Sequence, residues 1–165
     1  MPKAWFAVET WPRYERKIAD SLTAKGVDVF FPFQRQIRQW SDRRRAAELP
    51  LFPNYVFVHV SGEAESRLPV LRTTGVRKFV GSGSSGTPIP EAEVESIRLL
   101  MREGMFVQPH SYLSVGQRIR VRGGSLDGME GILAADNDGV DFVVSIELIQ
   151  RSIAVKLRGY QLEAA

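Results

Sequence analysis

The sequence predicts an α+β protein, in which a small antiparallel sheet with packed helices is followed by a small all-β barrel. Three observations carry this prediction. Residues 55–60 alternate between valines and other side chains, which is the two-residue period of a strand. Residues 13–25 and 90–103 carry apolar side chains at helical spacing. Beyond residue 115, short β-rich segments are separated by turn signals.

The first half of the chain predicts four strands and three helical segments. A strand at 5–10 places Phe6 and Val8 inward, and a helix at 13–25 carries Ile18 and Leu22 four residues apart. The further expected elements are a strand at 27–33 that continues loosely to 40, a hairpin tip at 41–45, a return strand at 52–60, a short helical turn at 63–72, a strand at 76–80, a Gly/Ser loop at 81–87, and a helix that begins at Pro90 and ends before Gly104. This order predicts an antiparallel four-stranded sheet with helices packed on it.

The stretch at residues 50–60, PLFPNYVFVHV, is the one around which this half is organised. Its alternate valines fall on one face of a strand and suit a buried core. The intervening Tyr55, Phe57 and His59 share the other face, and aromatic side chains with polar tips suit a surface that meets a partner. The alternative is that both faces are core, with the rings covered by a helix. Both interpretations fit the alternation.

The second half of the chain has a different residue pattern, with short β-rich segments in place of helical periods. Residues 106–114 have no period and are interpreted as an interdomain linker. The predicted barrel strands lie at 119–122, 131–133, 142–146, 152–155 and around Tyr160. The glycine-rich loop at 123–131 precedes a strand rather than a helix and has no Lys-Ser/Thr pair, so it is not a phosphate-binding loop. Its glycines are expected to supply positive-φ turns and close backbone approach.

Composition limits the classes of function. The chain has no cysteine and only two histidines, His59 and His110, which lie in separate segments without metal-ligand spacing. No nucleophile elbow or matched carboxylate pair is present, so we expect no enzyme activity, no metal and no cofactor. No apolar run is long enough to cross a bilayer, and the N-terminus lacks a signal-peptide core, so a location in the cytoplasm without membrane contact is expected. A monomer is also expected.

The formal net charge is only +3, but the basic residues are clustered at 43–45 and at positions 118, 120 and 122. Such clusters favour a nucleic-acid neighbour, although solvated surface arginines explain them equally well.

These residues together resemble the NusG family of transcription elongation factors. The family pairs a NusG N-terminal (NGN) domain with a C-terminal KOW domain, an SH3-like five-stranded barrel. The N-terminal resemblance rests on Trp5, the helix from Tyr14 to Leu22, the run LFPNYVFV at 51–58, residues 75–81 and Pro88-Ile89-Pro90. The C-terminal resemblance rests on VGQRIRV at 115–121, followed by Gly124, Leu126, Gly128, Glu130 and Gly131. The implied domains are 1–105 (NGN), a linker at 106–114, and 115–165 (KOW).

The resemblance implies that the NGN domain binds RNA polymerase, through an apolar depression that receives the clamp helices of the largest subunit. Phe52, Tyr55 and Phe57 match the motif that helps line this depression, which favours the partner interpretation of the aromatic side of the strand. Bridging the clamp is expected to hold the polymerase closed and to suppress pausing and termination. This is a binding mechanism without a covalent step.

Two further contacts are implied. In specialised paralogues within the family, contact with non-template DNA uses residues near the first helix and after the third strand. The candidates here are Arg13, Arg16, Lys17, Arg77 and Lys78. The KOW domain of the family recruits a small-subunit ribosomal protein or the termination factor Rho through an exposed loop. The corresponding residues are Leu148, Ile149 and Arg151, where Leu148 and Ile149 either dock on a partner or fold back as barrel core. A barrel is expected in the resting protein, because its β-branched residues and glycines disfavour a helix.

Within the family, the chain is most similar to the specialised RfaH/UpxY-like paralogues, because Asn54 stands where the general factor usually has glycine. We therefore expect an operon-specific antiterminator. The alternatives are a general NusG-type elongation or termination factor, and a KOW-type RNA-binding protein associated with the ribosome. One departure is that residues 66–69, Ser-Arg-Leu-Pro, do not match the His-Thr-Thr-Thr run with which RfaH makes its second polymerase contact.

Overall fold

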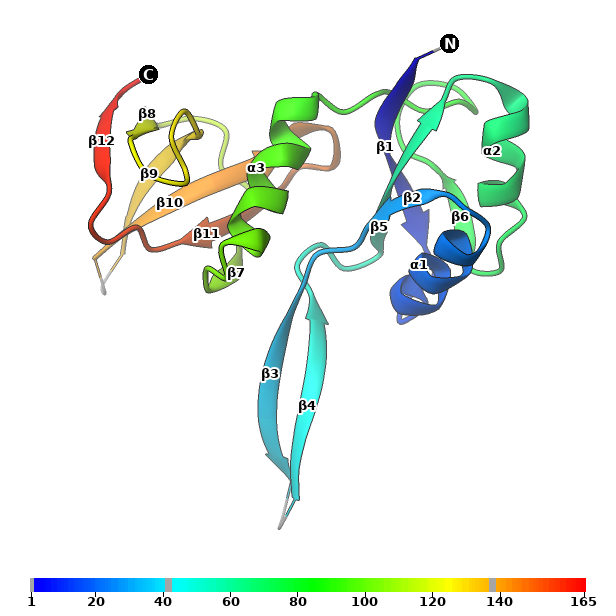
Figure 1. The fold of residues 1–165 in the computed structure, drawn as a ribbon, viewed down its shortest axis with the longest axis horizontal. Coiled ribbons are helices and arrows are strands. Elements are labelled where there is room, and N and C mark those ends of the chain that lie inside the picture. The colour runs from blue at the N-terminus through cyan, green and yellow to red at the C-terminus, as the bar shows by residue number, and fades with distance from the viewer. Residues whose placement is uncertain (1, 41–42, 137–138) are drawn as a thin grey trace. The chain divides into compact units, whose positions relative to one another are not determined.

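The structure is a computed structural model that describes residues 2–40, 43–136 and 139–165. The chain divides into two compact units, Met1–Glu91 and Ala92–Ala165, which are called the N-terminal unit and the C-terminal unit below. Figure 1 labels their elements. Each unit combines an antiparallel sheet with helical segments, so the predicted α+β class is confirmed.

The N-terminal unit is built on a four-stranded antiparallel sheet with the strand order β2-β5-β1-β6. The strands are β1 (Lys3–Thr10), β2 (Asp28–Phe30), β5 (Tyr55–Ser61) and β6 (Val76–Phe79). The central strands β1 and β5 pair from Lys3↔Ser61 to Glu9↔Tyr55. This register places the stretch that carries the sequence motif in the middle of the sheet.

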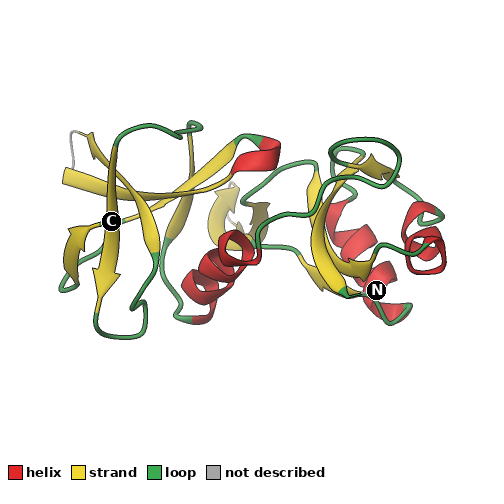
Figure 2. Ribbon diagram, turned by 90° about the horizontal axis from the view of Figure 1, so that it is seen from above, coloured by secondary structure: helices red, strands yellow, loops and turns green. Residues whose placement is uncertain are grey.

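Helices α1 (Glu15–Ala24) and α2 (Ala64–Leu71) pack on one face of this sheet, as Figure 2 shows. The core between the helices and the sheet consists of Phe6, Val8, Ile18, Leu22, Val56, Val58, Val60, Val70 and Phe79. The inward positions predicted for the first strand, the first helix and the alternating valines are therefore confirmed. Gly75 allows α1 to approach the turn before β6, because a Cβ at its φ of +96° would lie 2.6 Å from Cδ1 of Tyr14.

Strands β3 (Phe33–Trp40) and β4 (Arg43–Pro50) form a separate two-stranded ribbon that extends away from the sheet (Figure 1). The prediction that residues 52–60 form the return strand of this hairpin is wrong, because β4 returns and residues 51–54 turn before β5 begins. Two residues interrupt the extended chain between β4 and β5. Pro53 has no backbone N–H for a strand ladder, and Asn54 adopts a φ of +73°. Of the predicted hairpin tip, Ser41 and Asp42 lie outside the described residues.

The C-terminal unit contains a six-stranded antiparallel sheet with the order β12-β8-β9-β10-β11-β7. Its elements are α3 (Glu91–Arg102), β7 (Val107–His110), β8 (Gln117–Arg122), β9 (Glu130–Asp136), β10 (Gly139–Ile146), the 3₁₀ turn η1 (Glu147–Ile149), β11 (Arg151–Val155) and β12 (Gln161–Ala164). Strands β8 to β12 are the five predicted barrel strands. The glycine loop behaves as expected: Gly123, Gly124 and Gly128 have positive φ, and a Cβ on Gly131 would lie 2.7 Å from the Phe142 ring.

Two features differ from the predicted domain limits. Residues 107–110 of the predicted linker form β7, which pairs with β11 from Ser152↔His110 to Val155↔Val107. Helix α3 was assigned to the N-terminal domain from the sequence. In the structure, all of α3 except its first residue belongs to the C-terminal unit. Pro109 and the lack of period obscured the strand. Independent folding of 1–105 and 115–165 stays a prediction.

Candidate functional site

The sheet face opposite α1 and α2 carries a set of rings, which we name the aromatic face: Trp5, Phe30, Phe52, Tyr55, Phe57 and His59. All of them except Tyr55 are linked by ring contacts. The ring of Trp5 stacks on His59 with centroids 4.8 Å apart. Phe57 lies between two further rings, 6.2 Å from Phe30 and 5.6 Å from Phe52. The rings therefore hold one another in place across three strands and the turn before β5.

Access to this face is less than the sequence suggested. Phe52 and Phe57 are each only 1% exposed, so the alternative interpretation, in which the rings are core, holds for these two side chains. The reason is that the rings cover one another, and Ala7 lies opposite Phe57 in the β-ladder. Tyr55 is half-buried, and the His59 side chain keeps 27% of its surface exposed, 3.6 Å from the carboxylate of Asp28.

The turn that leads into β5 is held by α1. The Asn54 N–H donates to Oε2 of the buried Glu15 at 3.3 Å, and the Asn54 carbonyl accepts a bond from Thr10 N at 2.8 Å. Asn54 is in the left-handed region, where asparagine and glycine are the residue types best tolerated. Asparagine in place of the usual glycine is therefore a substitution that this backbone accepts.

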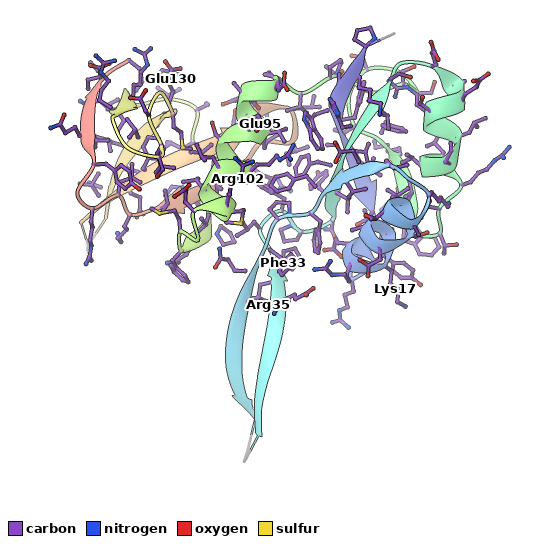
Figure 3. The ribbon with its side chains drawn as sticks, in the orientation of Figure 1. Lys17, Phe33, Arg35, Glu95, Arg102 and Glu130 are labelled. Carbon is purple, nitrogen blue, oxygen red and sulfur yellow. The ribbon has the colours of Figure 1, made fainter. Side chains whose placement is uncertain are left out.

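The basic residues predicted to contact DNA do not form one cluster. Arg16 forms ion pairs with Glu48 at 2.9 Å and with Asp20 at 3.5 Å. Arg77 forms an ion pair with Glu9 at 3.4 Å. Arg13, Lys17 and Lys78 are exposed. Figure 3 shows Lys17 on α1, where its ammonium lies 5.2 Å from the centre of the Tyr14 ring.

A shallow basic cleft of about 420 Å³ lies beside Lys17, and sequence reasoning missed most of it. It is lined by Tyr14, Lys17, Ser21, Lys25, Arg72, Thr73 and Thr74. Lys25 Nζ donates to Thr73 Oγ1 at 2.8 Å and to the Pro69 carbonyl at 3.2 Å, which ties the end of α1 to the end of α2. The sequence signal was present, since Lys17, Ser21 and Lys25 recur every four residues and so share one side of the chain.

Arg67 is a buried charge on the helix-covered side of the sheet, with 7% of its surface exposed. Its guanidinium lies 4.3 Å from the Phe6 ring centre and 4.8 Å from that of Phe79, and it donates to the Ser85 carbonyl. Its Nε has no hydrogen-bond partner among the described residues. Burial lowers the pKa of Arg67. Because Arg67 is buried, it offers no surface for the second polymerase contact that RfaH makes in this region.

The predicted partner loop of the C-terminal unit is only partly accessible. Ile149 is 5% exposed, so it folds back as core, whereas Leu148 is half-buried and Arg151 is exposed. The Arg151 guanidinium donates to the Ile149 and Gln150 carbonyls, which shapes the turn. Glu147 anchors the other end: its N–H donates to Glu93 Oε1 at 3.1 Å, and its carboxylate accepts the Tyr112 hydroxyl, which raises the pKa of Tyr112. Burial raises the pKa of Glu93.

Comparison with known proteins places this geometry in a family. The family model described as "Transcription termination factor nusG" matches residues 3–98, more than half of the 165-residue chain. The chain belongs to the NusG family. The transcription termination/antitermination protein NusG of Borreliella burgdorferi is 25% identical over 182 residues, covering 99% of both chains. The NusG of Staphylococcus aureus strain Mu50 is 25% identical over 174 residues, covering 98% of this chain and 95% of the relative.

A solved structure of Thermotoga maritima NusG, described as "Domain interaction in Thermotoga maritima NusG", shares the fold with a TM-score of 0.57. It is 23% identical and covers 99% of this chain and 98% of its own. The chain is accordingly a NusG-type transcription termination/antitermination factor, and the predicted pairing of an NGN domain with a KOW domain is confirmed. The NusG family is one of transcription factors rather than a known enzyme family.

Among the described residues, no helix is long and apolar enough to span a membrane. No group of three or more His, Cys, Asp or Glu side chains in the described ranges is placed to hold a metal ion.

Proposed function

We propose that this NusG-type factor binds RNA polymerase through the aromatic face and thereby suppresses pausing and termination. The observation that supports this most is a connected ring network on the sheet face that α1 and α2 leave free. The expected partner is the helix pair of the polymerase clamp, in the largest subunit. A connected set of rings offers much contact area while few torsions are frozen on binding.

The buried and the accessible rings have different roles in this proposal. Phe52 and Phe57 form the floor, because each is 1% exposed. Tyr55 and His59 carry the contact, because they are only half-buried and have polar tips. Their polar atoms can bond at the rim of an interface while the ring bodies are covered.

Tyr55→Ala tests the polymerase contact. If Tyr55 is an interface hot spot, the variant loses about 2 kcal/mol of binding free energy or roughly 30-fold in Kd for core RNA polymerase. Tyr55→Phe should keep most of the affinity. Trp11→Ala is the matched control, because Trp11 is a 46% exposed aromatic of the same unit outside the aromatic face. Equal losses for Tyr55→Ala and Trp11→Ala in surface-immobilised binding would contradict the proposal.

A second proposal concerns non-template DNA, and it moves the contact from Arg16 and Arg77 to the basic cleft. Lys17 and Arg72 lie in one cleft with the hydroxyls of Ser21 and Thr74, a set suited to phosphate oxygens. Lys17→Gln with Arg72→Gln should weaken binding to single-stranded DNA and reduce the salt dependence by about one unit of slope. Arg16→Gln is the control, since two carboxylates already occupy that guanidinium. An effect confined to the control variant would refute this placement.

For the C-terminal unit we propose a partner contact at Leu148 and Arg151, with a small-subunit ribosomal protein or Rho as the expected partner. Ile149 is left out because it belongs to the core. Leu148→Ser should reduce binding to one of these two proteins in a pull-down while the unfolding temperature is unchanged. Unaltered binding of both would remove the contact.

Whether the factor serves one operon or transcription in general also remains a proposal. We favour an operon-specific antiterminator on the resemblance to RfaH/UpxY-like paralogues. A run-through assay on several pausing templates tests it, since an operon-specific factor should act on a template with its own leader sequence and leave the others unchanged.

A further inference from the structure

A cleft of about 390 Å³ lies between the start of α1, the turn before β5 and the base of the β3–β4 ribbon. Its apolar walls are formed by Pro12, Phe31, Pro50 and Pro53. Asn54 also lines the cleft, and the next residue of the chain is Tyr55, which carries the polymerase contact proposed above. A partner that covers Tyr55 can therefore reach the cleft with one side chain.

The lining of the cleft includes two acids, and one of them is already paired with an arginine of the chain itself. Glu48 lies 2.9 Å from the Arg16 guanidinium. The same guanidinium lies 5.1 Å from the Phe31 ring centre and 4.6 Å from that of Phe33, which Figure 3 labels at the base of the ribbon. A guanidinium is stable in such a place, because its plane stacks on rings while its N–H groups donate to a carboxylate.

The second acid, Glu15, has no cationic partner among the described residues. It is only 5% exposed, although it lines the cleft. Its Oε2 accepts the Asn54 N–H at 3.3 Å, whereas its Oε1 accepts no hydrogen bond from the part of the chain that the structure describes. A carboxylate can accept about four hydrogen bonds, and a buried one is unfavourable while it lacks them. Glu15 therefore has unused capacity for a donor that comes from outside the chain.

We propose that this cleft receives an arginine side chain of RNA polymerase, which stacks on the prolines and forms an ion pair with Glu15. The inference rests on the proposed polymerase contact and adds a specificity-determining residue to it. Arginine fits better than lysine, because a planar and weakly hydrated guanidinium can lie against flat apolar groups and donate two hydrogen bonds to one carboxylate. Charge pairs that lose their water beside an aromatic anchor contribute strongly to the affinity of an interface.

Glu15→Gln tests the ion pair in binding assays with the full chain and core RNA polymerase, without nucleic acid. The amide keeps an oxygen that can accept the Asn54 N–H, so the unfolding temperature should be unchanged. The affinity should fall about tenfold or more, because the polymerase arginine loses its charged partner. Asp20→Asn is the matched control, since it removes the same charge from an exposed position of α1 outside the cleft. It should change Kd less than about twofold.

Arg13→Gln distinguishes a cationic occupant of the cleft from an anionic one. Arg13 is exposed and lines the same cleft, so its positive charge would repel an incoming arginine and attract an acidic group or a phosphate. Polymerase affinity should therefore be unchanged or higher in Arg13→Gln. A loss as large as that of Glu15→Gln would overturn the assignment to arginine.

The polymerase side of the pair is tested by exchanging each arginine of the clamp helices for glutamine in turn. One of these exchanges should weaken binding of the wild-type factor about tenfold and leave the affinity of Glu15→Gln unchanged, as expected for two partners of one interaction. If no clamp-helix arginine shows this coupling, the proposal is wrong.

Tyr55→Ala, measured in the same assay, separates this inference from the proposed function. If Tyr55→Ala loses affinity while Glu15→Gln behaves like Asp20→Asn, the aromatic contact stands and the arginine pocket is refuted. If neither Tyr55→Ala nor Glu15→Gln loses affinity, the polymerase contact through this part of the molecule is itself refuted.

Discussion

The two faces of β5 differ in what determines their residues. Val56, Val58 and Val60 face α1 and α2 and are at most 5% exposed. On the opposite face Phe57 is buried among rings, whereas Tyr55 and His59 keep part of their surface in contact with solvent. Packing alone therefore explains the valines. Packing also determines Phe57, whereas the partial exposure of Tyr55 fits the partner contact proposed above.

The largest effects are expected for the residues that are buried on either face. Phe57→Ala should lower the free energy of unfolding by about 3–5 kcal/mol and Val58→Ala by about 2–3 kcal/mol, because each leaves a cavity in packed surroundings. Urea unfolding measures both. Val58→Ala should nevertheless bind polymerase normally under conditions where it stays folded. A folded Val58→Ala protein with lost binding would mean that the two faces are not separable.

Sequence patterns predicted the position of a side chain correctly where burial in the core is the only requirement on it. The valines of β5 and the Ile18–Leu22 stripe of α1 were placed correctly, because burial follows the period of the element. The limits of β4 and β7 were not, because prolines at 50, 53 and 109 mark the ends and edges of strands without saying which strand they belong to. The burial of Phe52 and Phe57 was also missed, since these two rings contact each other and Phe57 also contacts Phe30 from another strand.

The basic cleft shows a related limit. Lys17 was predicted as a DNA contact, but Arg72 was not, because it reaches the same cleft from the end of a different helix. Arg16 was favoured by its charge alone, and only the fold reveals that Glu48, which is 32 residues away, already pairs with it. Charge can be read from a sequence, whereas its neutralisation by a distant residue cannot.

An intermediate effect is expected at Arg67, a buried charge on the helix-covered side of the sheet. Arg67→Ala should cost about 2–4 kcal/mol, because it leaves a cavity beside Phe6 and Phe79. Arg67→Met should stay within about 1 kcal/mol of the wild type. Methionine loses the contact of the cation with two rings, which lowers the stability of the fold. It also removes a buried N–H donor without a partner, which raises the stability by a similar amount.

Thermal and urea unfolding of the two Arg67 variants decide between packing and charge. If Arg67→Met is as unstable as Arg67→Ala, the charge itself holds the loop at Ser85, and the helix-covered face is not determined by packing alone. Polymerase affinity should be unchanged in both variants, because the guanidinium is 7% exposed.

The smallest effect on stability is expected at Tyr55, and it is the one that matters most for the comparison of the two faces. A half-buried side chain at the start of a strand contributes little to the core, so Tyr55→Ala should lower the free energy of unfolding by about 1 kcal/mol or less, in the same urea assay as Val58→Ala. Together with a 30-fold loss of polymerase affinity, this would separate access from packing. A destabilisation as large as that of Val58→Ala would instead make Tyr55 a core residue, and the aromatic face would then have no side chain of the motif left to present to a polymerase helix.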